Sequence, residues 1–325
     1  MKNYNSNKIR LLNELGFRDT FGKEILDLRD AYQNIAVVAA DLSDATRVTE
    51  FSKKFPHNFI QVGIAEQNMV SIAAGLSLNG KKCFCTTFAS FATMRCCEQI
   101  RNDVCYQNLD VKIVGIDSGV STGFLGVTHY GLEDIAIMRA FPNMVIISPS
   151  DCLALAKLLW EITEYPGPAY IRLSGGKDIP VIYPENQEFK LGKSITLLEG
   201  KDVTIIATGL MVFESLKAAK ILKEKGIRSS VIDMHTLKPL DNDAIKKSAE
   251  KTRLMVTVEE HNITGGLGSA VAEIMAEKGF SSNKLVRIGL PDAFFKKVGS
   301  HKNLLERYGL NSTGISNTII NNLQS

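Results

Sequence analysis

The segment FIQVGIAEQNMVSIAAGL, residues 59–76, places a carboxylate on an apolar helical stripe. The pattern predicts a short strand, a glycine break and then a helix, on which Glu66 shares its face with Met69, Val70 and Ala73. No Lys or Arg lies within four residues of Glu66 to pair with it. A buried, unpaired carboxyl should have a raised pKa, which would suit a proton donor or a hydrogen-bond partner for a ring nitrogen. A solvated, ionised glutamate in the first helical turn is the alternative.

Aromatic residues follow the next predicted strand. Phe88 and Phe91 come directly after the strand-like run KCFCTTF, and Met94 lies about one helical turn further on. Large apolar side chains at this spacing are typical of a packed core. The same stripe could also form a shelf on which the ring of a cofactor stacks.

A glycine-rich loop is the third candidate for chemistry. Residues 119–135, GVSTGFLGVTHYGLEDI, follow another predicted strand and carry glycines at four positions. Loops at the carboxyl ends of parallel strands are common ligand sites. His129 lies in this loop, where it could act as an acid or base or could have no special role.

Strand-like and helix-like runs alternate along the chain and would position these residues. Six strands are predicted over residues 34–41, 58–63, 82–88, 111–117, 144–150 and 169–174. The helix after the fifth strand is expected to use Ser150 as its N-cap. Apolar strands separated by helices predict a mainly parallel sheet covered on both faces.

The alternation breaks over residues 176–192, which carry Gly, Pro and charge without periodicity, and then restarts. We therefore expect two α/β domains, a mainly parallel one over 10–182 and a smaller mixed-sheet one over 190–325.

Composition narrows the class of protein. The 325 residues are 45% hydrophobic and 22% charged, and the net charge of +3 is too small to indicate nucleic-acid binding. The opening residues contain no apolar stretch typical of a signal peptide, and no later run is long enough to span a membrane. A cytoplasmic protein is expected. Five of the six cysteines fall within residues 83–105 without metal-site spacing, which predicts reduced, mostly buried thiols.

The order and spacing of these three clusters follow a known pattern. In this respect the sequence resembles the transketolase family of thiamine diphosphate enzymes. The matching segments are GIAEQNMVSIAAGL, TTFASFATMRCCEQIRNDV, GVTHYGLEDIAIMRAFPNMVIISPSD, GPAYIRL and TVEEHNITGGLGSAV. The chain is similar to the pyrimidine-binding and C-terminal domains, as found in the small subunit of a split transketolase. It is also similar to the corresponding part of deoxyxylulose-phosphate synthase.

The resemblance implies roles for the candidate residues. The glutamate at the Glu66 position hydrogen-bonds N1′ of the cofactor's aminopyrimidine ring and favours the imino tautomer that accepts the proton from C2. Phe88 and Phe91 match the aromatic wall around that ring, and Met94 stands where the family has a third aromatic residue. His129 matches the histidine of the family's Thr-His pair and is expected to act in catalysis and contact substrate.

The family holds the cofactor's diphosphate through a divalent metal at a Gly-Asp-Gly motif, which this sequence lacks. The resemblance therefore implies a separate N-terminal subunit that binds Mg²⁺ and the diphosphate, in an α2β2 assembly. This chain alone would bind no metal, would form a homodimer or associate loosely, and would be inactive.

Departures from the family pattern concern the substrate. Leu125 replaces an acidic residue that contacts sugar hydroxyls, and Tyr130 replaces a glutamine after His129. Gly175 stands where a phosphate-binding arginine is expected, which leaves Arg172 and Arg18 as predicted substrate contacts. The expected reaction is transfer of a two-carbon ketol unit between sugars, with a deoxy or otherwise modified sugar among them.

Two other functions remain open. The chain could be the β subunit of a 2-oxo acid dehydrogenase, or of an enzyme like deoxyxylulose-phosphate synthase, both of which share the glutamate and the aromatic wall. It could also be a non-catalytic scaffold subunit that keeps the fold without the chemistry.

Overall fold

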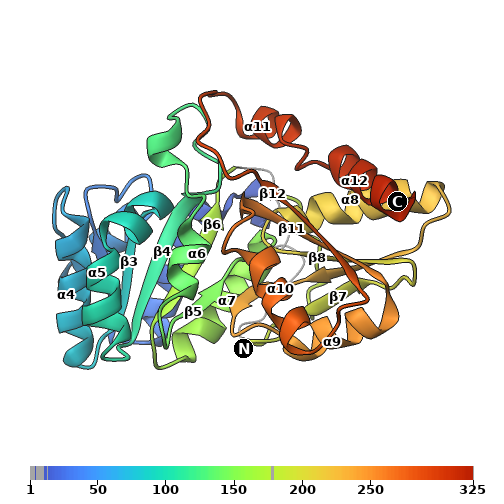
Figure 1. The fold of residues 1–325 in the computed structure, drawn as a ribbon. Helices are drawn as coiled ribbons and strands as arrows, with labels where there is room; N and C mark the ends of the chain where they lie inside the picture. Colours follow the sequence, from blue (N-terminus) through green and yellow to red (C-terminus); the bar gives the residue numbers. More distant parts are fainter. Residues whose placement is uncertain (1–3, 5–10, 13, 177–178, 325) are drawn as a thin grey trace.

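The computed structural model describes residues 4, 11–12, 14–176 and 179–324 and shows two α/β domains side by side (Figure 1). The first contains a seven-stranded sheet with strand order β10-β5-β6-β4-β3-β1-β2. The second contains a five-stranded sheet with strand order β12-β11-β8-β9-β7. The predicted fold class, a mainly parallel domain followed by a smaller mixed one, is confirmed.

The strands of the first domain follow the predicted runs closely. Their bounds are β1 (Ile35–Ala39), β2 (Phe59–Gln61), β3 (Lys82–Phe88), β4 (Val111–Ser118), β5 (Val145–Ile147) and β6 (Ala169–Ser174), and all six pair in parallel. Alternate residues of β1 enter different cores: Ala36 and Val38 pack on one face of the sheet and Val37 on the other. Burial on both faces explains why the inner strands are largely apolar, whereas the edge strand β2 is only partly buried.

Helices cover both faces of this sheet. Their bounds are α2 (Phe17–Ala31), α3 (Thr49–Lys54), α4 (Glu66–Leu78), α5 (Cys97–Gln99), α6 (Asp134–Arg139) and α7 (Cys152–Glu164). Short turns lie between them: the 3₁₀ turns η1 (Pro56–Asn58) and η4 (Val127–His129), and the π-helical segments η2 (Phe91–Arg95) and η3 (Ile100–Cys105).

The predicted N-cap of α7 is wrong. Asp151, not Ser150, caps this helix, and its Oδ1 accepts a hydrogen bond from the Ala154 N–H at 2.6 Å. The Ser150 hydroxyl instead donates to Asp233 of the second domain at 2.7 Å. Both residue types cap helices well, so the tertiary partner of Ser150 decides between them.

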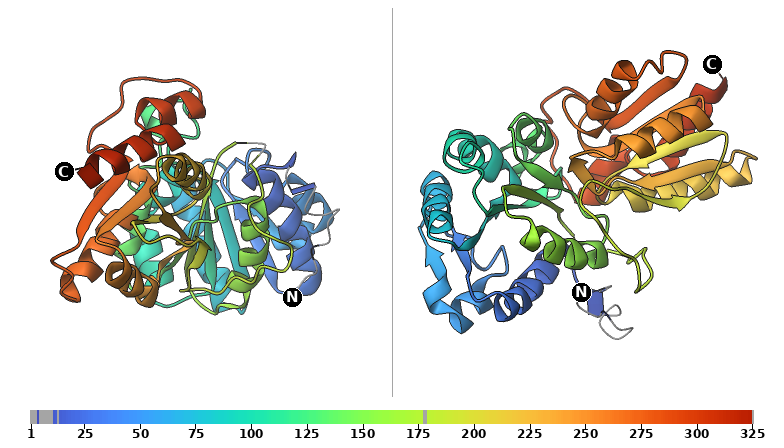
Figure 2. Two further views of the ribbon diagram at one scale, coloured as in Figure 1. Left: turned by 90° about the vertical axis from the view of Figure 1, so that its right-hand side faces the viewer. Right: turned by 90° about the horizontal axis from the view of Figure 1, so that it is seen from below.

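The second domain has its own alternation of strands and helices. Its strands are β7 (Ile195–Leu198), β8 (Val203–Ala207), β9 (Ser229–Asp233), β11 (Leu254–Asn262) and β12 (Lys284–Leu290), with β7 antiparallel to β9. Its helices are α8 (Met211–Glu224), α9 (Asn242–Lys251), α10 (Leu267–Glu277), α11 (His301–Arg307) and α12 (Ser312–Gln324). Helix α12, which ends the chain, packs beside α8 (Figure 2).

The two domains share structure across their boundary. Strand β10 (Thr236–Lys238), which lies within the second half of the sequence, pairs antiparallel with β5 and extends the first sheet. One apolar core also contains residues of both halves, such as Met138 and Ile232. The domains are therefore joined by a sheet edge and a common core, and we expect them to move as one body.

The cysteine side chains are free thiols, and most of them are buried. All six cysteines are free, five are buried, and burial raises the pKa of the Cys83, Cys96 and Cys105 thiols to about 12. The prediction of reduced, mostly buried thiols is confirmed.

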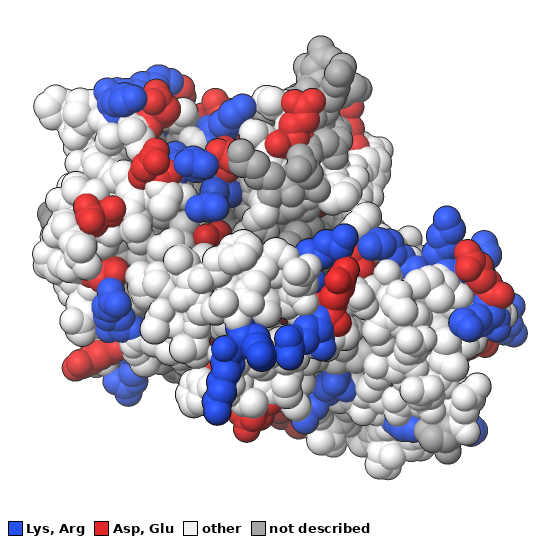
Figure 3. Space-filling view, turned by 90° about the horizontal axis from the view of Figure 1, so that it is seen from above, with Lys and Arg blue, Asp and Glu red and all other residues white. Residues whose placement is uncertain are grey.

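Charges of both signs are interspersed on the face seen from above (Figure 3). Within the part of the chain that the structure describes, no helix is long and apolar enough to cross a membrane.

Candidate active site

The predicted functional residues gather at the carboxyl edge of the first sheet, the upper edge in Figure 1. Glu66 begins α4 just after β2, and Phe88 is the last residue of β3. His129 lies in η4, after β4. Because β1, β2, β3 and β4 are parallel neighbours, the segments that follow them meet at one edge.

Glu66 is buried, as predicted, but it is not unpaired. Its side chain is 3% exposed, and its Oε1 lies 2.6 Å from a guanidinium nitrogen of Arg95. The guanidinium also stacks on the Phe91 ring, with its central carbon 4.4 Å from the ring centroid. The expectation of a carboxylate without a cationic partner is therefore wrong. Counting neighbours along one helix cannot find a partner that a different segment supplies.

Three rings form a compact group beside this ion pair. The centroids of Phe88 and Phe91 lie 5.6 Å apart with the ring planes at 88°. The His129 imidazole lies 5.4 Å from Phe88 and 5.1 Å from Phe91. The structure thus brings His129 to the aromatic residues, which sequence spacing alone could not establish. The two contacts of Phe88 are edge-to-face and the Phe91–His129 contact is tilted, both arrangements that aromatic pairs favour over a flat sandwich.

Arg95 is the functional candidate that the sequence analysis missed. It ends the π-helical segment η2, which begins at Phe91. Its place four residues after Phe91 in a helical segment was the available signal, because residues at this spacing lie on one face of a helix. Short π-helical segments within helices are frequent at functional sites.

Met94 and the middle of the glycine-rich loop are exposed. Met94 is 45% exposed, and Phe124, Leu125 and Val127 are 75%, 55% and 46% exposed. The role of Met94 as a cofactor contact stays a prediction. The exposed loop residues form an apolar surface of the kind that marks a binding site or an interface.

Glycines and one tyrosine fix the path of this loop. Gly119 and Gly131 exchange backbone hydrogen bonds of 2.9 and 3.0 Å, which close the loop at its base. A Cβ on Gly119 would lie 2.1 Å from Glu260 Oε1, so only glycine fits at that close approach. At the far end, the buried Tyr130 hydroxyl donates to the carbonyl oxygens of Gly123 and Lys297. Tyr130 therefore ties the loop to the second domain.

Arg172 is buried at an ion pair, and its predicted contact with a substrate phosphate stays a prediction. Its side chain is 2% exposed, and its Nε lies 2.8 Å from Oδ2 of Asp134, which is fully buried. The guanidinium also donates to the carbonyl oxygen of Glu260 at 2.8 Å. All these partners lie inside the protein, at the contact between β6 and the second domain. A substrate phosphate cannot reach this group without displacing a buried ion pair, which is costly.

Arg18, the other predicted substrate contact, is accessible. About a third of its side chain is exposed, and its Nε lies 3.5 Å from Asp117 Oδ1. Asp117 is 5% exposed and has a left-handed backbone with φ of +52°. Burial raises the pKa of Asp117, while Arg18 and His301 act in the opposite direction. The contact of Arg18 with substrate stays a prediction.

A metal site is a separate question. Among the described residues, no group of three or more His, Cys, Asp and Glu side chains is arranged to hold a metal ion.

The two domains each match a known family. Residues 13–177 match the family model "Transketolase, pyrimidine binding domain" and residues 192–315 match "Transketolase, C-terminal domain". Together they span most of the chain. The chain belongs to the transketolase family.

Relatives include subunits of divided enzymes. One subunit of an apulose-4-phosphate transketolase from Phocaeicola vulgatus is 40% identical over 95% of this chain and 97% of its own length. A 6-deoxy-6-sulfo-D-fructose transketolase subunit from Clostridium sp. (strain MSTE9) is 41% identical over 94% of this chain and 93% of its own length. A solved structure described as "Split gene transketolase, inactive beta4 tetramer" is 39% identical, covers 95% of this chain and 98% of its own, and superposes with a TM-score of 0.85.

Transketolases depend on thiamine diphosphate, and the residues at this edge fit its aminopyrimidine ring. A planar ring with polar nitrogens needs an acceptor at its edge and apolar surfaces at its faces. The buried Glu66 carboxylate would be that acceptor, and the Phe88 and Phe91 rings would supply the apolar surfaces. The planar Arg95 guanidinium, which stacks on Phe91 and pairs with Glu66, already makes both kinds of contact.

Proposed function

We propose that this chain is the C-terminal subunit of a two-component transketolase and supplies the pyrimidine-binding half of its active site. The observation that carries the proposal is a nearly fully buried Glu66 carboxylate, which the Arg95 guanidinium links to Phe91 in the group of three rings. A carboxylate shielded from water can hold a proton at a ring nitrogen, which a solvated one does poorly. The two transketolase subunits named above match this chain over more than nine-tenths of their own length, which supports the division into two chains.

Each residue has a task in this proposal. Bound thiamine diphosphate supplies a carbon nucleophile that accepts and releases a two-carbon ketol unit. Glu66 holds the proton at N1′ of the aminopyrimidine, and Phe88 and Phe91 exclude water from the ring and fix its plane. His129, at the edge of the aromatic group, is placed to exchange protons with substrate oxygens.

Replacing Glu66 by glutamine tests this role. Glu66→Gln keeps the shape of the side chain but cannot share a proton in the same way, so ketol transfer by the assembled enzyme should fall by at least about 100-fold. Glu98→Gln, an exposed change on α5, is the matched control. Circular dichroism should show both variants folded. Near-normal activity of Glu66→Gln, with partner subunit, cofactor and Mg²⁺ present, contradicts the proposal.

Assembly is the second part of the proposal. The partner subunit holds Mg²⁺ and the diphosphate, and the two chains form an α2β2 complex with two-fold symmetry. The tetramer of β chains described for the solved relative is inactive, so this chain alone should also self-associate without turnover. Light scattering with and without the partner checks the assembly. Tight, Mg²⁺-dependent binding of thiamine diphosphate to this chain alone, measured by calorimetry, contradicts it.

The second candidate is a non-catalytic scaffold subunit. The observation that favours it is the ion pair of Glu66 with Arg95, which occupies the carboxylate that the catalytic proposal needs. The activity assay separates the two, because a scaffold should give the same turnover whether position 66 is Glu or Gln.

A further inference from the structure

The glycine-rich loop that carries His129 is held by both domains. At its base, Gly119 and Gly131 pair through the backbone, just after the carboxyl end of β4. The His129 imidazole lies against the first domain, 5.4 Å from the Phe88 ring and 5.1 Å from the Phe91 ring. Three further anchors of the loop come from the second domain.

The first anchor is a buried carboxylate at the base of the loop. Glu260 lies on β11 and is 2% exposed, and its Oε1 accepts a hydrogen bond of 2.8 Å from the Val120 N–H. The same oxygen lies 2.8 Å from Nε2 of His301, the first residue of α11. One carboxylate oxygen therefore joins the loop to a strand and to a helix of the second domain, and hydrogen bonds to a charged group are among the stronger ones.

The second anchor is a backbone contact in the middle of the loop. The Gly299 N–H donates to the carbonyl oxygen of Gly123 at 3.1 Å. A Cβ on Gly123 would lie 2.2 Å from the Gly299 carbonyl oxygen and 2.8 Å from a methyl carbon of Leu304. Only glycine lets the two backbones meet this closely. Gly123 of the glycine-rich loop thus serves the contact between the domains.

The third anchor is Tyr130, the residue after His129. Its side chain is 2% exposed and lies in the apolar core that contains Leu304 of the second domain. Its hydroxyl lies 3.0 Å from the Gly123 carbonyl oxygen and 3.2 Å from the Lys297 carbonyl oxygen. Because carbonyl oxygens only accept hydrogen bonds, the hydroxyl proton is the donor that joins the loop to the second domain at this point.

Two consecutive residues of the loop therefore contact different domains. His129 lies on the aromatic rings of the first domain, whereas Tyr130 enters the core of the second. Since the two residues share a backbone, a shift of the Tyr130 side chain moves the His129 imidazole. The apex of the loop adds little packing that would resist such a shift, because Phe124 is 75% exposed and Leu125 is 55% exposed.

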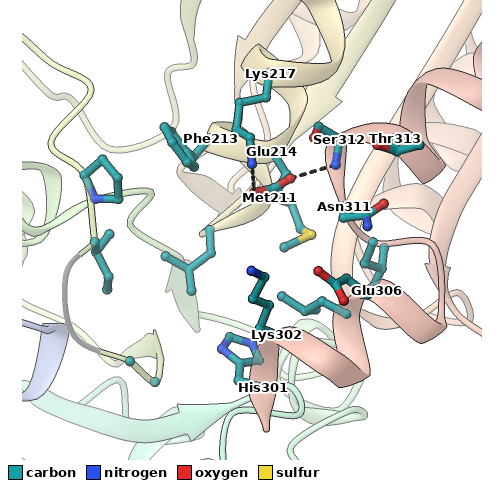
Figure 4. A pocket seen from close by; sticks show the side chains of 17 residues that line it. Met211, Phe213, Glu214, Lys217, His301, Lys302, Glu306, Asn311, Ser312 and Thr313 are labelled. Atoms are coloured by element: carbon teal, nitrogen blue, oxygen red, sulfur yellow. Dashed lines mark hydrogen bonds and ion pairs between the residues drawn. The ribbon is translucent and has the colours of Figure 1, made fainter. Parts of the chain in front are cut away.

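Helix α11 has a side that faces the loop and a side that faces a cavity. Leu304 is 3% exposed and lies against Gly123. Lys302 and Glu306 line a cavity of about 520 Å³ between α8, α11 and α12 (Figure 4). A change at Glu306 therefore alters the wall of the cavity and leaves the contact with the loop in place.

We propose that the second domain holds the glycine-rich loop in the position that catalysis requires, and that Tyr130 is the residue that positions His129. This inference rests on the proposed acid–base role of His129 and gives the second domain a task in the same reaction. A misplacement of about 1 Å can slow a catalysed reaction about 100-fold, so a small shift of the loop has a large effect.

Tyr130→Phe removes only the hydroxyl and tests the inference on the assembled enzyme. With the best of a set of ketose donors (xylulose 5-phosphate, fructose 6-phosphate and their unphosphorylated forms), kcat should fall about 10–100-fold. The dissociation constant of thiamine diphosphate should stay as in the wild type, because Glu66, Phe88 and Phe91 keep their places. A general loss of structure would weaken cofactor binding as well.

Two control variants should keep the wild-type kcat. Tyr165→Phe removes another tyrosine hydroxyl, which donates to the Asn143 carbonyl oxygen at 3.4 Å within the first domain. Glu306→Gln changes α11 on the side of the cavity. Gly123→Ala, in contrast, pushes the loop away from Gly299 and should lower kcat as Tyr130→Phe does, again with unchanged cofactor affinity.

A double-mutant cycle shows whether Tyr130 acts through His129. His129→Asn alone should lower kcat, and Tyr130→Phe added to it should cost less than about threefold more, because the residue being positioned is gone. Losses that multiply, or a Tyr130→Phe variant with the wild-type kcat, overturn the inference while the proposed function stands. A fully active His129→Asn variant refutes the acid–base role itself and the inference with it.

Hydrogen–deuterium exchange on the chain alone tests the anchor without turnover. If the assembled wild type turns over no ketose, the proposed function fails and this measurement decides. Tyr130→Phe should raise the exchange rate of peptides that cover residues 119–131 at least about threefold, and Tyr165→Phe should not. Faster exchange supports the anchoring of the loop by the second domain, and unchanged exchange overturns it.

Discussion

Arg95 competes with the cofactor in the proposed site, and removing it should tighten cofactor binding. Its guanidinium pairs with Glu66 at 2.6 Å and stacks on Phe91 at 4.4 Å, which are the two groups assigned to the aminopyrimidine. Binding of the ring therefore requires these contacts to break. Arg95→Met removes the cation and keeps an aliphatic side chain over Phe91.

The size of the effect follows from the exposure of Arg95. A hydrogen bond to a charged group contributes about 1.5–3 kcal/mol when shielded, but Arg95 is 44% exposed, so a smaller value applies. Stacking of a partly exposed cation on an aromatic ring adds about 0.5–1 kcal/mol. Together they give about 1–2 kcal/mol, which corresponds to a roughly 5–30-fold tighter dissociation constant for thiamine diphosphate.

Calorimetric titration of the assembled enzyme with thiamine diphosphate at saturating Mg²⁺ measures this constant. Arg101→Met, a change of an exposed arginine in the neighbouring segment η3, is the control and should bind like the wild type. Unchanged or weaker binding by Arg95→Met would refute the reasoning. Weaker binding would mean that Arg95 contacts the bound cofactor itself.

Three further predictions concern other parts of the chain. The double change Phe124→Glu with Leu125→Asp restores the acidic loop of the family. It should raise the ratio of kcat/KM for ordinary ketose phosphates to kcat/KM for the native donor. An unchanged ratio would show that the loop does not select the substrate. Arg172→Met leaves the Asp134 carboxylate buried without its cation. Urea unfolding should therefore show a free energy of unfolding lower by about 3–5 kcal/mol. A variant that is as stable as the wild type but binds phosphate substrates weakly would instead support the predicted contact of Arg172 with substrate. Burial raises the pKa of the Asp233 carboxyl to about 7. The folded state therefore binds this proton more tightly than the unfolded state does. The contribution of Asp233 to the free energy of unfolding is present at low pH and is lost as the pH rises through 7. The stability of Asp233→Asn relative to wild type should therefore increase by about 2 kcal/mol between pH 5 and 7.5, measured by urea unfolding, and a pH-independent difference would contradict the assignment.

The sequence by itself determined the fold class and the elements that carry the site. The buried strands β1 and β3 to β6 coincide with largely apolar runs because both faces of the parallel sheet are covered. The burial of Glu66 also follows from local pattern, since the apolar stripe of α4 must face the core and Glu66 lies on it. The linker near residue 180 follows from its composition.

Tertiary structure alone decided which side chains meet. Arg95 reaches Glu66, and Asp134 reaches Arg172, between segments that are far apart in the sequence. Ser150 hydrogen-bonds Asp233 instead of capping α7. Strand β10 of the second half of the chain pairs with β5 of the first domain. Sequence periodicity predicts which face of a helix or strand is buried. It does not predict which polar side chain of another element will contact that face. Ion pairs and sheet edges depend on distances of a few ångströms in three dimensions, and only packing of the whole chain sets those distances.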